Sequence, residues 1–516
     1  MRQSRAVQRN AFFVSFVSIS TASLAVTTVS LRAEAADFEV TSDTAAQFYD
    51  VRSPTGENVL MRRRMTTTLG VGAYNILDRT PENPSGPEIT FRARMRYDAD
   101  YGAGGLETDP SSFARFVPGY SRGPVDLMYG YIEGRRFASG YLGFKLGRQY
   151  MTDALGWWSF DGGLVRVTTP FFVAVEGYGG LEVRGGLPLS SPRFERDGVW
   201  RGDRSGYDPS LYPSFQRNDV APAMGVALES VGPTWIHARA TYRRVLNTGE
   251  SNLSQFTSGL TQPISYDATR VSQERIGYAL DATLGNIAGF KGGFAYDLYL
   301  RKMGNVYASV DTFVTQKLTA SLDYDFYQPT FDADSIWNFF ASEPMNDFGV
   351  RATYDATPKL SVSGGGHARM YNVRTSPDST SSSANVSSTV NTSYFPTNGT
   401  PFDEGGDLSA RYRWGQGILG ARARGNFGSG GDRVGGDLNA ERVIETRYVV
   451  SGRASLWQWN DKLRPDRDAV SVGYVAGLGY LFGPRSKAMF EFEHTMNRLV
   501  GQRFRAMLWL TVAVTK

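Results

Sequence analysis

Arginine and aspartate recur at every second position in several segments of this 516-residue chain. The clearest case is the segment 89–101, which reads ITFRARMRYDADY. Successive side chains point to opposite faces of a strand, whereas a helix would spread these charges around its circumference. We therefore predict a strand with one charged face and one apolar face. Its guanidinium groups offer carboxylates and sulfates a planar fork of donors.

The same alternation predicts charged faces on many further strands. A charge at the middle of a lipid bilayer costs about 2–4 kcal/mol, so these faces require a wet or internally paired lumen. The candidates for the lumen are Arg92, Arg94, Arg96, Arg275, Lys291, Arg301, Arg351, Arg369, Arg411, Arg413, Arg422, Arg424, Asp98, Asp297, Asp323 and Asp325. Further candidates are Arg239, Arg243, Arg503, Arg505, Asp281, Asp347, Glu491 and Glu493.

Two roles are open for these charges. They either attract an anionic solute, or they pair across strands and hold the shape of the fold. Pairing is the simpler expectation for any single residue. The Arg clusters around positions 92–96 and 422–424 favour conduction for the set as a whole.

Catalytic chemistry has little support. A hydrolase needs His beside Ser or Asp, and the chain has three His, at His237, His367 and His494. His367 shares a predicted strand face with Ser361 and Ser363, but no nucleophile motif accompanies it. No Cys/His cluster suits zinc. We expect no enzyme activity, no catalytic residue, no metal and no cofactor.

The composition favours an envelope protein. Gly (57), Phe (31) and Tyr (27) are abundant, and Cys is absent, which suits an oxidising compartment. Beyond the N-terminus no window of about 18 apolar residues occurs, so a membrane would have to be crossed by strands. Acidic and basic residues nearly balance, so no overall basic field indicates nucleic acid.

The N-terminus has the features of an export signal. Arg2, Arg5 and Arg9 form a basic region, residues 11–31 are uncharged and mostly apolar, and small residues precede Ala36. We predict cleavage of residues 1–35. Residues 36–516 would then form one domain.

The strand windows and their connections decide the fold class. The windows are close to the length of about 9–11 residues that a tilted membrane strand needs, and short turns alternate with long polar loops. We predict an all-β protein, a single transmembrane antiparallel up-and-down β-barrel of about 18 strands, with 16–20 as the range. Its long loops would be extracellular and its short turns periplasmic. The barrel would contact bacterial outer-membrane lipid and be inserted by the barrel assembly machinery.

Two long polar segments, 184–220 and 372–406, are the candidates for loops that gate the lumen. The final strand, near residues 503–515, alternates as expected for a lipid-facing strand. The chain ends in Lys516, whereas most outer-membrane barrels end in an aromatic residue.

One segment carries a family resemblance. It contains LGRQ at 146–149, the pair Trp157 and Trp158, FDGG at 160–163 and LVRVT at 164–168. This segment resembles the outer-membrane porins of alginate export and related polysaccharide secretion. The resemblance implies a channel that exports an exopolysaccharide or capsule polymer beside a periplasmic export partner.

Other functions remain open at this point. A diffusion porin for small anionic or sugar solutes would have the same charged lumen. A structural or adhesive barrel that presents the Ser- and Thr-rich segment 372–406, or a barrel hydrolase, is a further alternative.

Overall fold

The computed structural model describes residues 37–77, 86–100, 125–183, 221–248, 269–331, 344–371, 402–462 and 464–515. The predicted signal peptide, the predicted gating loop 184–220 and residues 372–401 of the second predicted loop lie outside these ranges. In the described part of the chain, no helix is long and apolar enough to cross a membrane.

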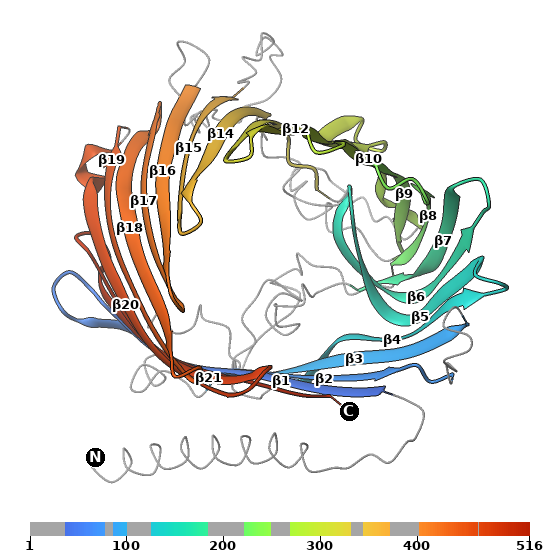
Figure 1. Cartoon of the computed structure of the whole chain (residues 1–516), viewed down its shortest axis with the longest axis horizontal. Coiled ribbons are helices and arrows are strands. Elements are labelled where there is room, and N and C mark those ends of the chain that lie inside the picture. The colour runs from blue at the N-terminus through green and yellow to red at the C-terminus, as the bar shows by residue number, and fades with distance from the viewer. Residues whose placement is uncertain are drawn as a thin grey trace, which may run out of the picture.

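The described residues form a closed antiparallel barrel of 22 strands (Figure 1). Each strand is hydrogen-bonded to the next, and β1 pairs with β22, which closes the sheet. The strands are β1 (Asp37–Arg52), β2 (Asn58–Tyr74), β3 (Glu88–Asp100), β4 (Val125–Phe137), β5 (Leu142–Asp153), β6 (Gly156–Thr168), β7 (Val173–Glu182), β8 (Pro222–Ser230), β9 (Ile236–Asn247), β10 (Arg270–Leu284), β11 (Ala288–Asp297), β12 (Lys302–Thr315), β13 (Leu318–Tyr327), β14 (Met345–Thr357), β15 (Leu360–Tyr371), β16 (Phe402–Trp414), β17 (Gly417–Gly428), β18 (Gly431–Ile444), β19 (Tyr448–Asp461), β20 (Ala469–Gly483), β21 (Ser486–Asn497) and β22 (Gly501–Thr515). A short 3₁₀ helix, Pro465–Arg467, lies between β19 and β20.

The antiparallel all-β barrel confirms the predicted architecture, but the predicted number of about 18 strands is wrong, because the described residues form 22. The error comes from tight turns that lie inside single predicted strand windows. The alternation predicts one strand window over 408–427, but the structure has the hairpin of β16 and β17 there, which turns at Gly415 and Gln416. The window 290–302 runs through the turn between β11 and β12.

The two rims of the barrel differ. Connections after even-numbered strands are mostly tight, as at 138–141 and 285–287, while long stretches such as 101–124 and 184–220 follow odd-numbered strands. Short periplasmic turns and long extracellular loops are typical of outer-membrane barrels. We therefore call the rim with the tight connections periplasmic and the rim with the long connections extracellular.

The outer surface of the barrel is apolar. Leu322 of β13 is 61% exposed and lies opposite Val350 of β14, which is 56% exposed. The alternate residues of the same strands, among them Asp323 and Arg351, carry charge and point to the other face. A closed sheet with this pattern faces lipid outside and water inside, so the protein is a transmembrane barrel of the bacterial outer membrane.

Candidate functional site

The register brings the charged faces of neighbouring strands together on the inner side of the barrel. On β3 the inner residues Arg92, Arg94 and Arg96 lie opposite Gly72, Gly70 and Thr68 of β2. Only the strand position of Asp98 is described, opposite Thr66.

The three arginines of β3 have different surroundings. Arg94 donates to Asp43 Oδ2 at 2.5 Å and to Thr68 Oγ1 at 2.8 Å, so it is held in the wall. Arg96 is buried, with 3% of its surface exposed. Arg92 is half-buried, and no carboxylate of the described residues forms an ion pair with it.

A second cluster lies on β14, β16 and β17 around Asp407. Arg351 and Arg422 approach the Asp407 carboxylate at 3.2 Å and 3.4 Å, and Arg424 is its register partner. Arg351 reaches Asp407 across Gly365 of β15, which has no side chain in the way. The Asp407 carboxylate therefore pairs with two arginines, and Arg424 lies beside them on β17 without an ion pair to a described carboxylate, so the cluster keeps a net positive charge.

Two other predicted basic residues form close pairs. Arg275 contacts Asp297 at 3.1 Å, and Asp297 is only 2% exposed. Arg369 contacts Asp347 at 2.5 Å. These pairs join adjacent strands and hold the wall in register.

The remaining predicted residues are placed as follows. Lys291 is the register partner of Asp281, and Arg411 lies opposite Ser361 and Gly420. Asp323 and Asp325 lie on β13, opposite Gly349 and Asp347. No described carboxylate forms an ion pair with Arg411, Arg413 or Arg424. Arg301 is not on a strand, because it lies in the turn between β11 and β12 with a φ of 53°.

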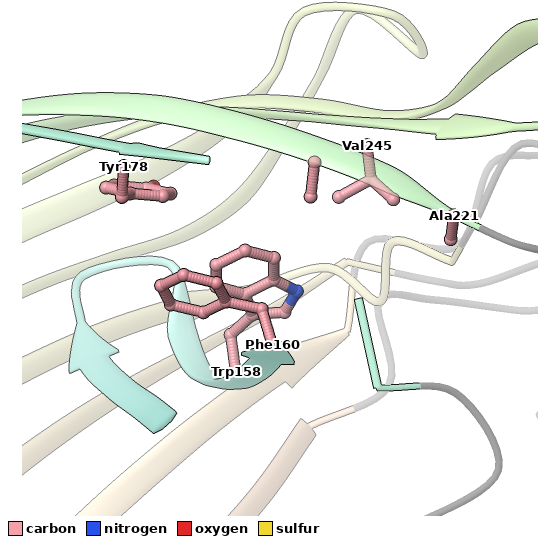
Figure 2. Close-up of a cluster of buried hydrophobic side chains, with 6 residues drawn as sticks. Trp158, Phe160, Tyr178, Ala221 and Val245 are labelled. Atoms are coloured by element: carbon pink, nitrogen blue, oxygen red, sulfur yellow. The ribbon is translucent and has the colours of Figure 1, made fainter. Parts of the chain in front are cut away.

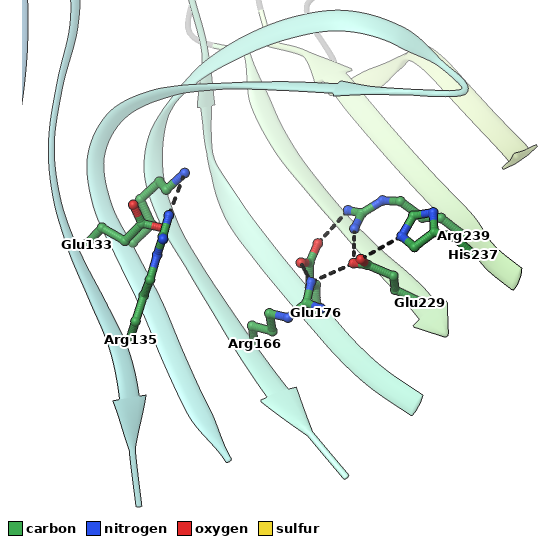
Figure 3. Close-up of polar contacts among 8 residues, drawn as sticks. Glu133, Arg135, Arg166, Glu176, Glu229, His237 and Arg239 are labelled. Carbon is green, nitrogen blue, oxygen red and sulfur yellow. Dashed lines mark hydrogen bonds and ion pairs between the residues drawn. The ribbon is translucent and has the colours of Figure 1, made fainter. Parts of the chain in front are cut away.

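A charge network on β6–β9 was not predicted as a unit (Figure 3). Arg166 lies 2.5 Å from both Glu176 and Glu229, and Arg239 contacts the same two carboxylates. His237 adds a contact of 3.0 Å to Glu229. The network spans four strands and is internally satisfied, so it is a cross-link of the wall rather than a solute site.

The other two histidines lack a catalytic arrangement. His494 lies between Tyr474, whose hydroxyl is 3.0 Å from Nδ1, and the ring of Phe504, with ring centroids 4.2 Å apart. His367 lies opposite Gly349 and Gly405 on the inner face. Among the described residues, no group of three or more His, Asp or Glu could hold a metal ion.

The β5–β6 hairpin leaves the wall and curls into the lumen (Figure 1). Arg148 is the last residue of β5 that pairs with β4, and β6 begins to pair with β7 at Phe160. Between them, residues 150–158, which we call the hairpin tip, have strand partners only within the hairpin.

The hairpin tip packs on the inner wall through aromatic rings. Trp158 and Phe160 stack with centroids 4.5 Å apart, and Tyr178 of β7 lies 5.7 Å from each (Figure 2). Ala223 and Val245 belong to the same buried cluster. These residues form an apolar core inside the barrel, where water would otherwise be expected.

The end of the tip is held on β9 and β10. A Cβ atom at Gly277 would lie only 2.8 Å from Leu155 Cδ2, so the missing side chain makes room for the tip. Arg243, 2% exposed, donates to the Leu155 carbonyl at 3.2 Å, and its guanidinium lies 5.1 Å from the Trp158 ring centroid. A cation over an indole ring is attracted to it.

Glycines allow the inward bend. Gly147 has a φ of +126°, which is unfavourable for other residues. A Cβ at Gly162 would lie 2.2 Å from the Gly179 carbonyl oxygen, and one at Gly180 would lie 2.2 Å from the Asp161 carbonyl oxygen. The sequence contains this signal, but strand alternation alone does not reveal it.

The comparisons with known proteins identify no family. No protein-family model and no curated protein matches the chain. Among solved structures, OccAB4 of Acinetobacter baumannii is similar at 8% identity and a TM-score of 0.43, covering 94% of this chain and 99% of that one. OpdK of Pseudomonas aeruginosa with vanillate aligns at 10% identity and a TM-score of 0.38, with 93% and 99% covered. A BenF-like porin of Pseudomonas fluorescens Pf-5 aligns at 6% identity and 0.40, with 93% and 99% covered. The fold assignment rests on the strand register, not on these alignments.

The predicted function in polysaccharide secretion is wrong. The solved structures that align are named as Occ, Opd and BenF-like proteins, and none of these three is named as a polysaccharide exporter. The segment that suggested secretion is the β5–β6 hairpin, where Arg148 pairs with Asp161 at 2.7 Å and glycines produce the bend. Its residues are therefore explained by the local fold. The prediction of a periplasmic export partner rested on the function in polysaccharide secretion.

Proposed function

We propose that the protein is an outer-membrane diffusion channel for small anionic solutes. The observation that carries this proposal is the Asp407 cluster, in which Arg351 and Arg422 share one carboxylate and Arg424 lies beside it without an ion pair to a described carboxylate. Arg351 and Arg422 have side chains that are 47% and 43% exposed, so their guanidinium groups can meet a solute in the lumen. A positive inner wall raises the local concentration of anions.

The hairpin tip supports a channel for small solutes. Barrels of about 22 strands enclose a wide lumen that is commonly filled by other parts of the chain. Here the tip occupies part of the lumen and is fixed by Leu155, Trp158 and Phe160. The remaining passage is narrower than the barrel itself.

Ion selectivity tests the proposal. In planar bilayers with a KCl gradient, the reversal potential should report preference for chloride. Replacing Arg422 and Arg424 with Gln should lower the chloride-to-potassium permeability ratio by about tenfold, since each unit of charge near 6 Å in water changes the local energy by roughly 0.7 kcal/mol and two charges are removed.

A control is Arg467→Gln, which removes one positive charge from the short helix between β19 and β20. It should leave the ratio unchanged. A channel that prefers potassium, or a double variant with the parental ratio, would contradict the proposed function. The selectivity should also weaken between 0.1 and 1 M salt, as the Debye length falls from about 10 to 3 Å.

A further inference from the structure

Arg92 lies in an aromatic environment on the inner wall, next to the base of the β5–β6 hairpin. Its register partner on β4 is Tyr131, and its register partner on β2 is Gly72. Tyr74, Tyr129 and Tyr150 are also electrostatic neighbours of its guanidinium. These residues come from β2, β3, β4 and the hairpin tip, so the folded barrel is needed to bring them together.

The four tyrosine rings lie close to one another around the strand position of Arg92. The Tyr74 ring lies across Gly72, since a Cβ there would be 2.8 Å from Tyr74 Cε2. The ring centroid of Tyr129 lies 5.9 Å from that of Tyr131, with an angle of 41° between the ring planes. It lies 5.7 Å from the ring centroid of Tyr150, with an angle of 59° between the planes. Tyr150 is 44% exposed. The arrangement places tilted tyrosine rings next to the strand position of one arginine.

Arg92 differs from its neighbours in having capacity for a ligand. Arg94 is committed to Asp43 and Thr68, and Arg96 is almost fully buried. Within the described ranges Arg92 forms no ion pair, although it is only half-buried. Lys145 lies 4.8 Å from the Tyr131 ring centroid, and its charge is balanced by Glu133 at 4.0 Å, so Arg92 supplies the cation of this region.

We propose that Arg92 with Tyr74, Tyr129, Tyr131 and Tyr150, the Arg92 subsite, binds solutes that carry a carboxylate on a six-membered ring. The guanidinium fork matches a carboxylate through two parallel hydrogen bonds. The rings of Tyr129 and Tyr150 provide apolar contact for a ring, while the buried Tyr131 packs in the wall behind them. This inference rests on the proposed anion channel and specifies which anions it retains.

The hairpin completes the subsite. Tyr150 belongs to the hairpin tip, whereas the other tyrosines belong to the barrel wall. Docking of the tip therefore places the fourth ring beside Tyr129. The docked hairpin tip therefore narrows the lumen and also contributes a ring to the Arg92 subsite.

Block of the chloride current by added carboxylates is the test. Benzoate and glucuronate carry the carboxylate on an aromatic and a sugar ring, and acetate has no ring. In bilayers with the full-length channel, at least one of the two ring carboxylates should reduce the KCl conductance at a concentration where acetate does not. The stronger blocker tells which ring the subsite prefers.

Substitutions in the Arg92 subsite test whether the carboxylate blocks the channel at this position. Arg92→Gln should raise the half-blocking concentration of the stronger blocker by about tenfold, because charge-assisted hydrogen bonds are lost. Tyr150→Leu should raise it about threefold through loss of the ring contact. Tyr354→Leu, on the outer face of β14, removes a tyrosine from another strand and should have no effect.

The outcomes separate this inference from the proposed function. If the channel selects chloride but acetate blocks as well as the ring carboxylates, or Arg92→Gln leaves the block unchanged, the subsite is overturned and the anion channel stands. If the channel does not select anions, the proposed function fails first. If Arg92→Gln does not insert, Arg92→Lys keeps the charge without the planar fork. It should still weaken the block severalfold, and a parental block in this variant would overturn the subsite.

Discussion

At the scale of single residues, the alternation in the sequence predicts which face of a strand is charged, but it does not predict which ion pairs form. The alternation in segment 89–101 predicts which face is charged, and the register puts Arg92, Arg94 and Arg96 on one face. It does not predict partners, because Asp43 is 51 residues from Arg94 in the sequence. Partners depend on which strands become neighbours and with which register, and local patterns do not specify either.

The network of Arg166, Glu176, Glu229 and Arg239 illustrates the same limit. Each residue looks like an ordinary inner-face charge in the sequence. Glu229 and Arg166 are 63 positions apart, yet their side chains meet at 2.5 Å. A buried cation loses its favourable solvation, so such pairs persist only where the strands bring them together.

Glycine positions at the hairpin bend give a prediction at this scale. Gly162→Ala places a methyl group 2.2 Å from the Gly179 carbonyl oxygen and 2.7 Å from Gly180 Cα, so backbone must move. We expect a loss of about 1–3 kcal/mol in the free energy of unfolding, as for other overpacked sites. The midpoint of heat-induced unfolding on gels measures this change.

Gly177→Ala is the matched control, because it lies on β7 and a Cβ there meets nothing within 4 Å. It should unfold at the parental temperature or slightly above. Equal midpoints for the two variants would mean that the close approach of β6 and β7 is not needed for the bend.

At the scale of elements, turns explain where the sequence-based prediction fails. Residues Glu445 and Thr446 turn the chain between β18 and β19 with positive φ values of 52° and 58°. Two-residue hairpin turns favour such values and usually use Gly or Asn. Without those residues, the turn is invisible in the pattern and two strands merge into one. The turn at Gly415 and Gln416 does contain a glycine, but it too lies inside one predicted strand window and contributes to the low strand number.

The hairpin tip provides a prediction for this scale. A Cβ at Gly277 would lie 3.0 Å from Ala154 Cβ, close to the separation of about 3.5–4.5 Å found in disulfides. The chain has no Cys, so the double variant Ala154→Cys/Gly277→Cys can form one disulfide only. Oxidation should fix the tip on β10 and raise the stability by up to about 4 kcal/mol, as expected for a long closed loop.

Conductance of the oxidised and reduced double variant then reports the state of the tip in the open channel. We expect equal single-channel conductance in both, because the docked tip belongs to the conducting form. Either single variant should be indifferent to oxidant. A collapse of conductance on oxidation, reversed by a thiol, would show that ions pass only when the tip has left the wall.

At the scale of the whole molecule, the fold class follows from the sequence because the alternation is repeated in every third of the chain. An exterior that includes Leu322 and Val350 is stable only against lipid. The filling of the lumen by residues 150–158 does not follow from local alternation. Their inward course depends on glycines at 147, 162 and 180 and on the apolar cluster that receives Trp158 and Phe160.

The last prediction concerns what limits the passage through the barrel. The predicted gating loop 372–406 is too long, because residues 402–406 belong to β16. The segments 184–220 and 372–401 remain predicted gating loops, whereas the hairpin tip occupies the lumen in the described structure. Replacing residues 150–158 with a Gly-Gly turn should raise single-channel conductance at least about twofold, because barrels of this size are wide when unfilled. It should also weaken the block by ring carboxylates, since Tyr150 is lost. Deleting residues 372–401 provides the comparison. If that deletion raises conductance and removal of the tip does not, the loop rather than the hairpin sets the width of the pathway.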